Sequence, residues 1–206
     1  MIRDPKDLKR YTASERLNHW TVGISFILLA LSGLPFFHPA FFPFTQFFGG
    51  PVWARILHPY IGVLMALAFL VIFLRFWQLN RLTAVDKAWL KNAHKMVDGD
   101  DHDMPEQGKY NGGQKVMFWA LALCMALMTA SGLAIWRAWF GFDITVVRLG
   151  AVVHAPTAAV MIALIMVHVY AAIWVKGTVR AMWYGTVTRA WAKQHHRAWY
   201  RQVTGK

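Results

Sequence analysis

The chain has 206 residues, of which 57% are apolar and 15% aromatic, and its formal net charge is +12. Soluble domains are typically about 45–50% apolar, so a soluble core of this length would not hide so many apolar side chains. The positive charge does not indicate nucleic-acid binding, because the basic residues flank apolar segments instead of forming a groove or stripe among polar residues. The composition therefore excludes an ordinary soluble domain and favours a membrane protein.

Apolar segments of membrane-spanning length occur four times. A helix needs roughly 20 apolar residues to cross a hydrocarbon core of about 30 Å. The segments that meet this length are approximately 20–37, 56–77, 116–136 and 146–175. Because no Ser/Gly-rich linker divides them, we expect a single domain, 1–206, of the all-α class: a four-helix transmembrane bundle. In the long connection, 78–113, we expect a short surface helix and a solvated loop.

Lys and Arg residues gather in three of the five segments outside these spans. Such residues are retained on the cytoplasmic side of a membrane. The three groups hold five, five and seven of them: Arg3, Lys6, Lys9, Arg10 and Arg16; Arg81, Lys87, Lys91, Lys95 and Lys109; Lys176, Arg180, Arg189, Lys193, Arg197, Arg201 and Lys206. The middle group is counted over the loop 78–113. Around the other two connections lie Arg55, Arg137 and Arg148. We therefore expect cytoplasmic N- and C-termini and a cytoplasmic loop 78–113, in a multi-pass protein surrounded by membrane lipid.

Four of the nine histidines lie in or at the spans: His19, His58, His154 and His168. An ionisable side chain inside a bilayer is costly and usually faces the bundle interior with a partner. In the expected orientation, His58 and His154 lie near the outer side, whereas His19 and His168 lie nearer the cytoplasm. His154 and His168 are separated by nearly four helical turns, about 21 Å of rise, so both face the same interior.

Two histidines at one depth on different helices suit a haem iron. Two nitrogen ligands leave no open coordination position, which favours reversible electron transfer over oxygen binding. Two such haems about 20 Å apart would form an electron pathway through most of the bilayer. Small residues leave space for flat groups between the helices: Gly23, Ser32, Gly33, Gly62, Ala66, Ala158, Ala159 and Ala163.

Other interpretations of these histidines remain open. Each could be a polar residue satisfied by a neighbouring helix, or the four could form a proton pathway. A zinc site fits poorly, because its four ligands converge to about 2.0–2.1 Å from one ion. The single cysteine, Cys124, lies within the third apolar segment and excludes an intrachain disulfide, a Cys-ligated iron–sulfur cluster and covalent haem attachment through C-x-x-C-H. We expect Cys124 to be a small buried apolar residue. The acidic run at 98–103 does not match the Ca²⁺ loop pattern.

Several stretches resemble the cytochrome b (gamma) subunit of membrane-bound respiratory formate dehydrogenases. They are RILHPYIGV, GKYNGGQKVMFW, VHVYAAIWVKG and the tail RAWAKQHHRAWYR. The resemblance covers nearly the whole chain, although the four-histidine pattern is shared with the cytochrome b subunits of nickel–iron hydrogenases. The cytochrome b of such a hydrogenase, or of a related periplasmic oxidoreductase, is therefore the alternative. A haem-free membrane anchor or transporter is a third possibility.

The resemblance implies a dihaem subunit that anchors its complex in the bacterial cytoplasmic membrane. It would take electrons from an iron–sulfur beta subunit, which is fed by a molybdenum or tungsten alpha subunit that oxidises formate. It would pass them to menaquinone or ubiquinone and perform no chemistry on formate itself.

Site residues are carried over by position from these stretches and from the order of the four histidines, which also matches the family. For the two haem b groups, the axial ligands fall on His58 and His154 (outer haem) and on His19 and His168 (inner haem). The quinone contacts fall on Asn111, Gly113 and Gln114, with His168 beside them. One departure is Gly112, where the family pattern leads us to expect Ala.

Overall fold

The computed structural model describes residue 4 and residues 6–97 and 104–205. The acidic run at 98–103 lies outside the described residues. The chain divides into two compact units. Unit 1 consists of Met1–Arg16, Arg75–Ala120 and His168–Lys206, and unit 2 consists of Leu17–Leu74 and Leu121–Val167.

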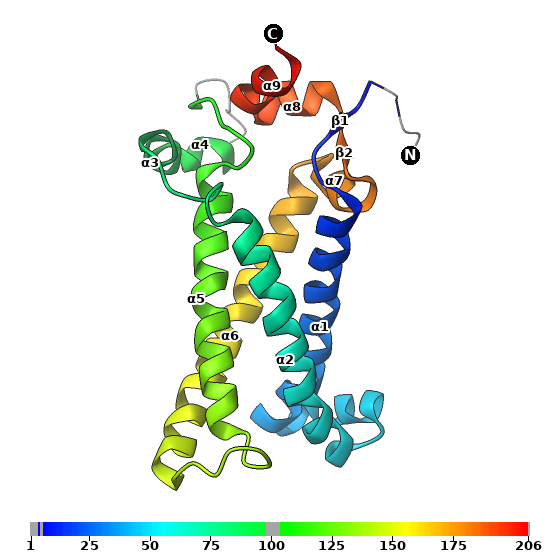
Figure 1. Cartoon of the computed structure of the whole chain (residues 1–206), viewed down its shortest axis with the longest axis vertical. Coiled ribbons are helices and arrows are strands. Elements are labelled where there is room, and N and C mark those ends of the chain that lie inside the picture. Colours follow the sequence, from blue (N-terminus) through cyan, green and yellow to red (C-terminus); the bar gives the residue numbers. More distant parts are fainter. Residues whose placement is uncertain (1–3, 5, 98–103, 206) are drawn as a thin grey trace. The chain divides into compact units, whose positions relative to one another are not determined.

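Four long helices carry the apolar segments (Figure 1): α1 (Ala13–Phe37), α2 (Pro51–Phe76), α5 (Gly112–Ile135) and α6 (Ile144–Trp174). Among the described residues, these are the helices long and apolar enough to cross a membrane, which confirms the number of predicted spans. Each helix begins two to seven residues before its predicted span. The reason is that hydropathy marks only the apolar part of a helix and omits its polar first turn.

Local sequence signals set the starts of these helices. At α1, Glu15 N donates to Thr12 Oγ1 (3.3 Å) and Thr12 N donates to Glu15 Oε2 (2.7 Å), a reciprocal capping box. At α6, the Asp143 carboxylate accepts a hydrogen bond from Thr145 N at 2.8 Å. Helix α2 begins with Pro51, at a position where the missing N–H costs no helical hydrogen bond.

Most residues in the apolar stretches of the long helices are not buried within the protein. Only 6% of the most apolar 18-residue stretch is buried in α2 and α6, and 17% in α1 and α5. Water does not tolerate contiguous apolar surface on this scale, whereas lipid chains surround it at no cost. The chain is therefore a membrane protein of mostly helical structure.

Unit 2 packs portions of all four long helices around a core rich in sulfur. The residues at its centre are between 3% and 7% exposed: Met65 of α2, Cys124 and Met125 of α5, and Met161 of α6. Side chains of α1 pack against them, among them Val22, Phe26 and Leu29. The burial of Cys124 confirms the expectation that it is a core residue.

The connection from α1 to α2 is a 3₁₀ helix, η1 (Pro39–Phe48), which His38 caps. His38 Nδ1 accepts a hydrogen bond from Ala40 N at 3.2 Å. Gly49 and Gly50 follow with φ angles of +83° and +105°, which only glycine adopts readily, and they turn the chain into α2.

In unit 1, the long connection contains two short helices, α3 (Ala84–Lys91) and α4 (Ala93–Val97), where the sequence led us to expect one. Lys115 of α5 forms a buried ion pair of 2.7 Å with Asp86 of α3 and donates to the Arg81 carbonyl at 3.2 Å. Burial by itself raises the pKa of Asp86, but hydrogen bonds from Lys115 and Thr83 outweigh it and hold that pKa below its usual value. The charged pair thus fixes α3 to the start of α5.

The C-terminal region folds into α7 (Thr178–Tyr184), β2 (Thr186–Val187), α8 (Arg189–His195) and α9 (Arg197–Thr204). Strand β2 pairs antiparallel with β1 (Leu8–Lys9). Helices α7, α8 and α9 and strand β2 share one core, which contains Ala181, Val187, Trp191, Ala192 and Trp199. Hydropathy predicts no element after residue 175, because these short helices carry many polar residues.

Arg10 and His196 join three segments of unit 1. His196, only 1% exposed, donates from Nδ1 to the Gly108 carbonyl at 2.7 Å, and its Nε2 lies 3.3 Å from the Arg10 guanidinium. The guanidinium also donates to the Lys109 carbonyl and lies 4.9 Å from the ring centre of Trp199. Since Arg10 only donates, His196 Nε2 must be the acceptor, and the imidazole is neutral.

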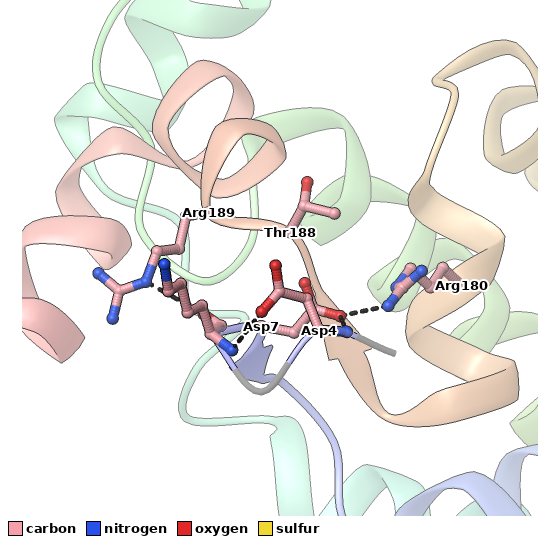
Figure 2. A pocket seen from close by; sticks show the side chains of 6 residues that line it. Asp4, Asp7, Arg180, Thr188 and Arg189 are labelled. Carbon is pink, nitrogen blue, oxygen red and sulfur yellow. Dashed lines mark hydrogen bonds and ion pairs between the residues drawn. The ribbon is translucent and has the colours of Figure 1, made fainter. Parts of the chain in front are cut away.

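A second charged cluster of unit 1 lines a cavity of about 240 Å³ (Figure 2). Arg180 forms an ion pair with Asp7, and both side chains are largely buried. Arg189 Nε donates to the Lys6 carbonyl at 3.0 Å, and Lys6 N donates to Asp4 Oδ1 at 2.8 Å. These contacts anchor the described part of the N-terminal segment to α7 and α8.

His196 makes the stability of the protein depend on pH. Burial, and then the Arg10 charge, lower the pKa of His196 from 6.5 to about 3. Below about pH 6.5, His196 binds a proton in the unfolded chain but stays neutral in the folded chain. The free energy of unfolding should therefore fall as pH drops, by at most about 1.4 kcal/mol per pH unit. Thermal unfolding of the detergent-solubilised protein from pH 8 to 5, followed by tryptophan fluorescence, measures this.

The control is His94→Gln, at an exposed histidine of α4. It should keep the wild-type pH dependence, whereas His196→Gln should weaken it. Equal pH dependence in the wild type and in His196→Gln would contradict the assignment.

Candidate functional site

His58 of α2 and His154 of α6 lie next to each other in unit 2. Their ring centres are 6.3 Å apart and the ring planes are inclined by 65°. Both side chains are partly buried. The structure therefore brings together the two imidazoles that the sequence places at one depth near the outer side.

Each of these rings contacts a serine on another helix. His58 Nδ1 lies 2.8 Å from Ser32 Oγ of α1, and His154 Nδ1 lies 3.0 Å from Ser131 Oγ of α5. Ser32 is fully buried and Ser131 is 5% exposed. In both cases Nδ1 is turned toward a hydroxyl, which leaves Nε2 as the ring nitrogen available to a ligand.

A glycine follows each serine and lies against the same imidazole. A Cβ atom at Gly33 would approach His58 Cε1 to 3.0 Å, and one at Gly132 would approach His154 Cε1 to 3.4 Å. Any side chain at Gly33 would therefore push against the ring. The glycines allow each imidazole to lie close to the neighbouring helix backbone.

Sequence reasoning missed the contacts of Ser131 and Gly132, and it noted Ser32 and Gly33 only as small residues. The signal is present in the sequence, since the tripeptide Ser-Gly-Leu occurs at 32–34 and again at 131–133. Ser32 precedes His58 by 26 residues, and Ser131 precedes His154 by 23. Two similar helix pairs, each with a Ser-Gly-Leu followed by a histidine, would have predicted this arrangement.

The other two histidines fall in different units. His19 lies on the part of α1 within unit 2 and is partly buried, whereas His168 lies on the part of α6 within unit 1 and is exposed. Their pairing stays a prediction from the sequence.

Asn111 and Gln114 form a reciprocal capping box at the start of α5. Gln114 N donates to Asn111 Oδ1 at 2.9 Å, and Asn111 N donates to Gln114 Oε1 at 3.1 Å. Both side chains are partly buried. The capping bonds use the two amide oxygens, so the amide NH₂ groups do not take part in them.

Close packing by α3 accounts for the glycines between these two residues. A Cβ atom at Gly112 would lie 2.9 Å from the Asp86 carbonyl oxygen, and one at Gly113 would lie 3.1 Å from the Trp89 ring. The first contact is with backbone, which cannot easily move aside. This explains why Gly112 stands where the family pattern suggests Ala.

The fold and the paired imidazoles define a class of protein: a helical membrane protein with two neighbouring histidines on different helices, their ring centres 6.3 Å apart. Among the described residues, no group of three or more His, Cys, Asp or Glu side chains could hold a metal ion. Haem, which brings four ligands of its own, needs only the two histidines.

The chain belongs to the prokaryotic cytochrome b561 family, which its residues 10–185 match. It is accordingly a membrane protein that transfers electrons through haem b.

Relatives of known function are similar over most of their length. The formate dehydrogenase cytochrome b556(fdo) subunit of Escherichia coli strain K12 is 47% identical over 94% of this chain and 92% of its own. The nitrate-inducible cytochrome b556(Fdn) subunit of the same strain is 41% identical over 92% of this chain and 88% of its own. The cytochrome b556 subunit of formate dehydrogenase from Haemophilus influenzae is 38% identical over 94% of this chain and 82% of its own.

The geometry at His58 and His154 fits a haem iron. An imidazole nitrogen binds a metal at about 2 Å and lies about 1.1 Å from its ring centre, so two axial rings have centres about 6 Å apart. The distance in the structure is 6.3 Å. Gly33 and Gly132 add no side-chain bulk beside the two rings.

Proposed function

We propose that this chain is the dihaem cytochrome b subunit of a formate dehydrogenase complex and carries electrons across the membrane to quinone. The observation that carries the proposal is the His58–His154 pair, with ring centres 6.3 Å apart. The relatives support it, since they are cytochrome b556 subunits of formate dehydrogenases. Residues 1–206 then act as a single cytochrome b domain. Its partners are an iron–sulfur beta subunit and a molybdenum or tungsten alpha subunit, and it performs no chemistry on formate.

His58 and His154 are the axial ligands of the outer haem in this proposal. When bound, haem b supplies an iron that gains and loses one electron reversibly. The protein holds the two imidazoles on different helices and turns Nδ1 of each toward a serine hydroxyl. With both axial positions taken, oxygen has no place to bind.

His19 and His168 are the proposed ligands of the inner haem. The argument is from sequence, because His168 follows His154 by nearly four helical turns and so faces the same way about 21 Å further along α6. Two haems at this spacing give electrons a path through most of the hydrocarbon core.

Charge and folding together support the proposed orientation. In unit 1, β1 pairs with β2, Arg10 donates to the Lys109 carbonyl, and Ala198 N donates to the Gln107 carbonyl at 3.1 Å. These contacts support a common side of the membrane for the N-terminal segment, the long connection and the C-terminal region, since only there could they fold together. The concentration of Lys and Arg in these three segments makes that side the cytoplasm.

Quinone reduction is proposed at the start of α5, with Asn111, Gly113, Gln114 and His168 as contacts. A quinone needs hydrogen-bond donors for its two carbonyl oxygens, where negative charge develops on reduction. The amide NH₂ groups of Asn111 and Gln114 are such donors, because the capping box engages only their oxygens. The cytoplasm, on the proposed side, supplies the protons. Menaquinone and ubiquinone both present the carbonyl pair that these donors recognise.

Fusions to alkaline phosphatase test the orientation. The enzyme needs disulfides and is active only in an oxidising compartment. A fusion after Lys206 should be inactive, whereas the control fusion after Gly141, in the exposed connection between α5 and α6, should be active. The opposite pattern would reverse the proposed depths of all four histidines.

Removal of one proposed ligand tests the haem assignment. His154→Ala should reduce the haem content from about two to about one per chain, because the outer haem loses one of the two histidine ligands around which its site is built. Dithionite should still reduce the remaining haem, but formate should not, since electrons enter from the outer side. The control His38→Ala, at a histidine outside the spans, should keep both haems. Full haem content in the His154→Ala complex, measured by absorption spectroscopy, would contradict the assignment.

Asn111 variants separate helix capping from quinone contact. Asn111→Ser keeps an oxygen that caps α5 but removes the amide NH₂, so it should lower formate-to-quinone turnover roughly 2- to 10-fold, the worth of one hydrogen bond. Formate-to-dye activity and the haem spectra should not change. The same substitution at Asn92, which ends α3, serves as the control. Wild-type turnover and apparent quinone affinity in Asn111→Ser would place the donors elsewhere.

A further inference from the structure

Both serines at the outer histidines use their only proton elsewhere. Ser32 Oγ lies 2.8 Å from the Leu28 carbonyl oxygen, and Ser131 Oγ lies 2.6 Å from the Leu127 carbonyl oxygen. A carbonyl oxygen has no proton to give, so at these distances the hydroxyl must donate to it. A serine hydroxyl carries a single hydrogen. In its contact with histidine, the serine oxygen is therefore the acceptor.

The direction of that hydrogen bond fixes the form of each imidazole. His58 Nδ1 must carry the proton that Ser32 accepts. His154 Nδ1, 3.0 Å from Ser131 Oγ, must likewise carry a proton, and His154 also has a hydrogen bond to the Met128 backbone. A neutral imidazole with its proton on Nδ1 has its lone pair on Nε2. Nε2 is then the only nitrogen that can bind iron.

We propose that Ser32 and Ser131 are positioning residues of the outer haem: each holds one axial histidine in the Nδ1-protonated form and lowers the haem's reduction potential. The inference rests on the proposed function of His58 and His154. An acceptor at Nδ1–H makes Nε2 a stronger electron donor, and a stronger donor stabilises the oxidised iron. The effect belongs to the hydroxyl oxygen and not to the volume of the side chain.

The arrangement on the two sides of the site is similar, and His154 has in addition a hydrogen bond to the Met128 backbone. Each serine comes from the helix that precedes the histidine's helix in the chain, is followed by glycine, and donates to the carbonyl four residues earlier. At both axial histidines the serine therefore makes Nε2 a stronger electron donor. Loss of both serines should have a larger effect than loss of either one.

The test uses the purified complex with Ser32→Ala, Ser131→Ala and the double variant. Redox titration of the haem absorption bands gives the potential of each haem, and electron paramagnetic resonance of the oxidised complex reports on the axial ligands. In each Ala variant we expect two haems, with the potential of one raised, a changed resonance of that haem, and a larger shift in the double variant. The other haem should not change.

Two further variants separate the hydroxyl from packing. Ser25→Ala removes a hydroxyl that is also buried, at 3% exposure, two turns earlier on α1, and it should leave both potentials unchanged. Ser131→Thr keeps the hydroxyl and should keep the potential close to that of the wild type. Loss of the haem in Ser131→Ala but not in Ser131→Thr would also support the proposal, because Thr keeps the hydroxyl that Ala lacks.

Other outcomes would overturn the inference. Unchanged potentials and resonances in the double variant would show that the serines do not act on the haem, while the proposed function would stand. Equal shifts in Ser131→Ala and Ser131→Thr would assign the effect to packing. A wild-type complex without b-type haem absorption would instead defeat the proposed function itself.

Discussion

An imidazole between apolar helices is stable only when its polar atoms have partners, because hydrocarbon offers no hydrogen bond in place of water. At His58 and His154 the protein meets this requirement with a serine that is itself satisfied by its own helix. The backbone carbonyl fixes the direction of the serine O–H, and the serine oxygen fixes the orientation of the imidazole ring. As a result the helix backbone sets the direction of Nε2, and any change in the register between the two helices of a pair would turn the ring.

The same interaction explains why the two halves of unit 2 look alike. The pair α1–α2 and the pair α5–α6 each provide a Ser-Gly-Leu tripeptide, a histidine, and a buried methionine seven residues after it, Met65 or Met161. In the proposed function, a flat haem held from both faces by these histidines would present nearly the same surface to each side. Two similar helix pairs can therefore supply similar contacts, and the methionines fill the core about 10 Å further along the helices.

Sequence patterns predicted what depends on long stretches of residues and missed what depends on single contacts. Four apolar runs of spanning length are hard to mistake, so the four helices were predictable, but their polar first turns were not. The partners of His58 and His154 were missed because serine and glycine are frequent in membrane helices. The folded C-terminal region was missed because its core uses few large apolar residues, chiefly Trp191 and Trp199, among many charges. The capping role of Asn111 was predictable, since its spacing from Gln114 is that of a capping box.

The positive charges of unit 1 have two roles that the sequence alone does not separate. Arg10 and Arg180 count toward the charge bias on which the proposed orientation rests, yet both are buried, one against His196 and aromatic rings and the other against Asp7. A buried, paired arginine cannot be removed or moved across the membrane without leaving its partners unsatisfied. By contrast, Arg197 and Arg201 form exposed pairs with Glu106, which contribute little to stability. The buried arginines therefore tie orientation to folding: only when the two termini and the long connection lie on the same side can Arg10 reach the Lys109 carbonyl and Arg180 reach Asp7.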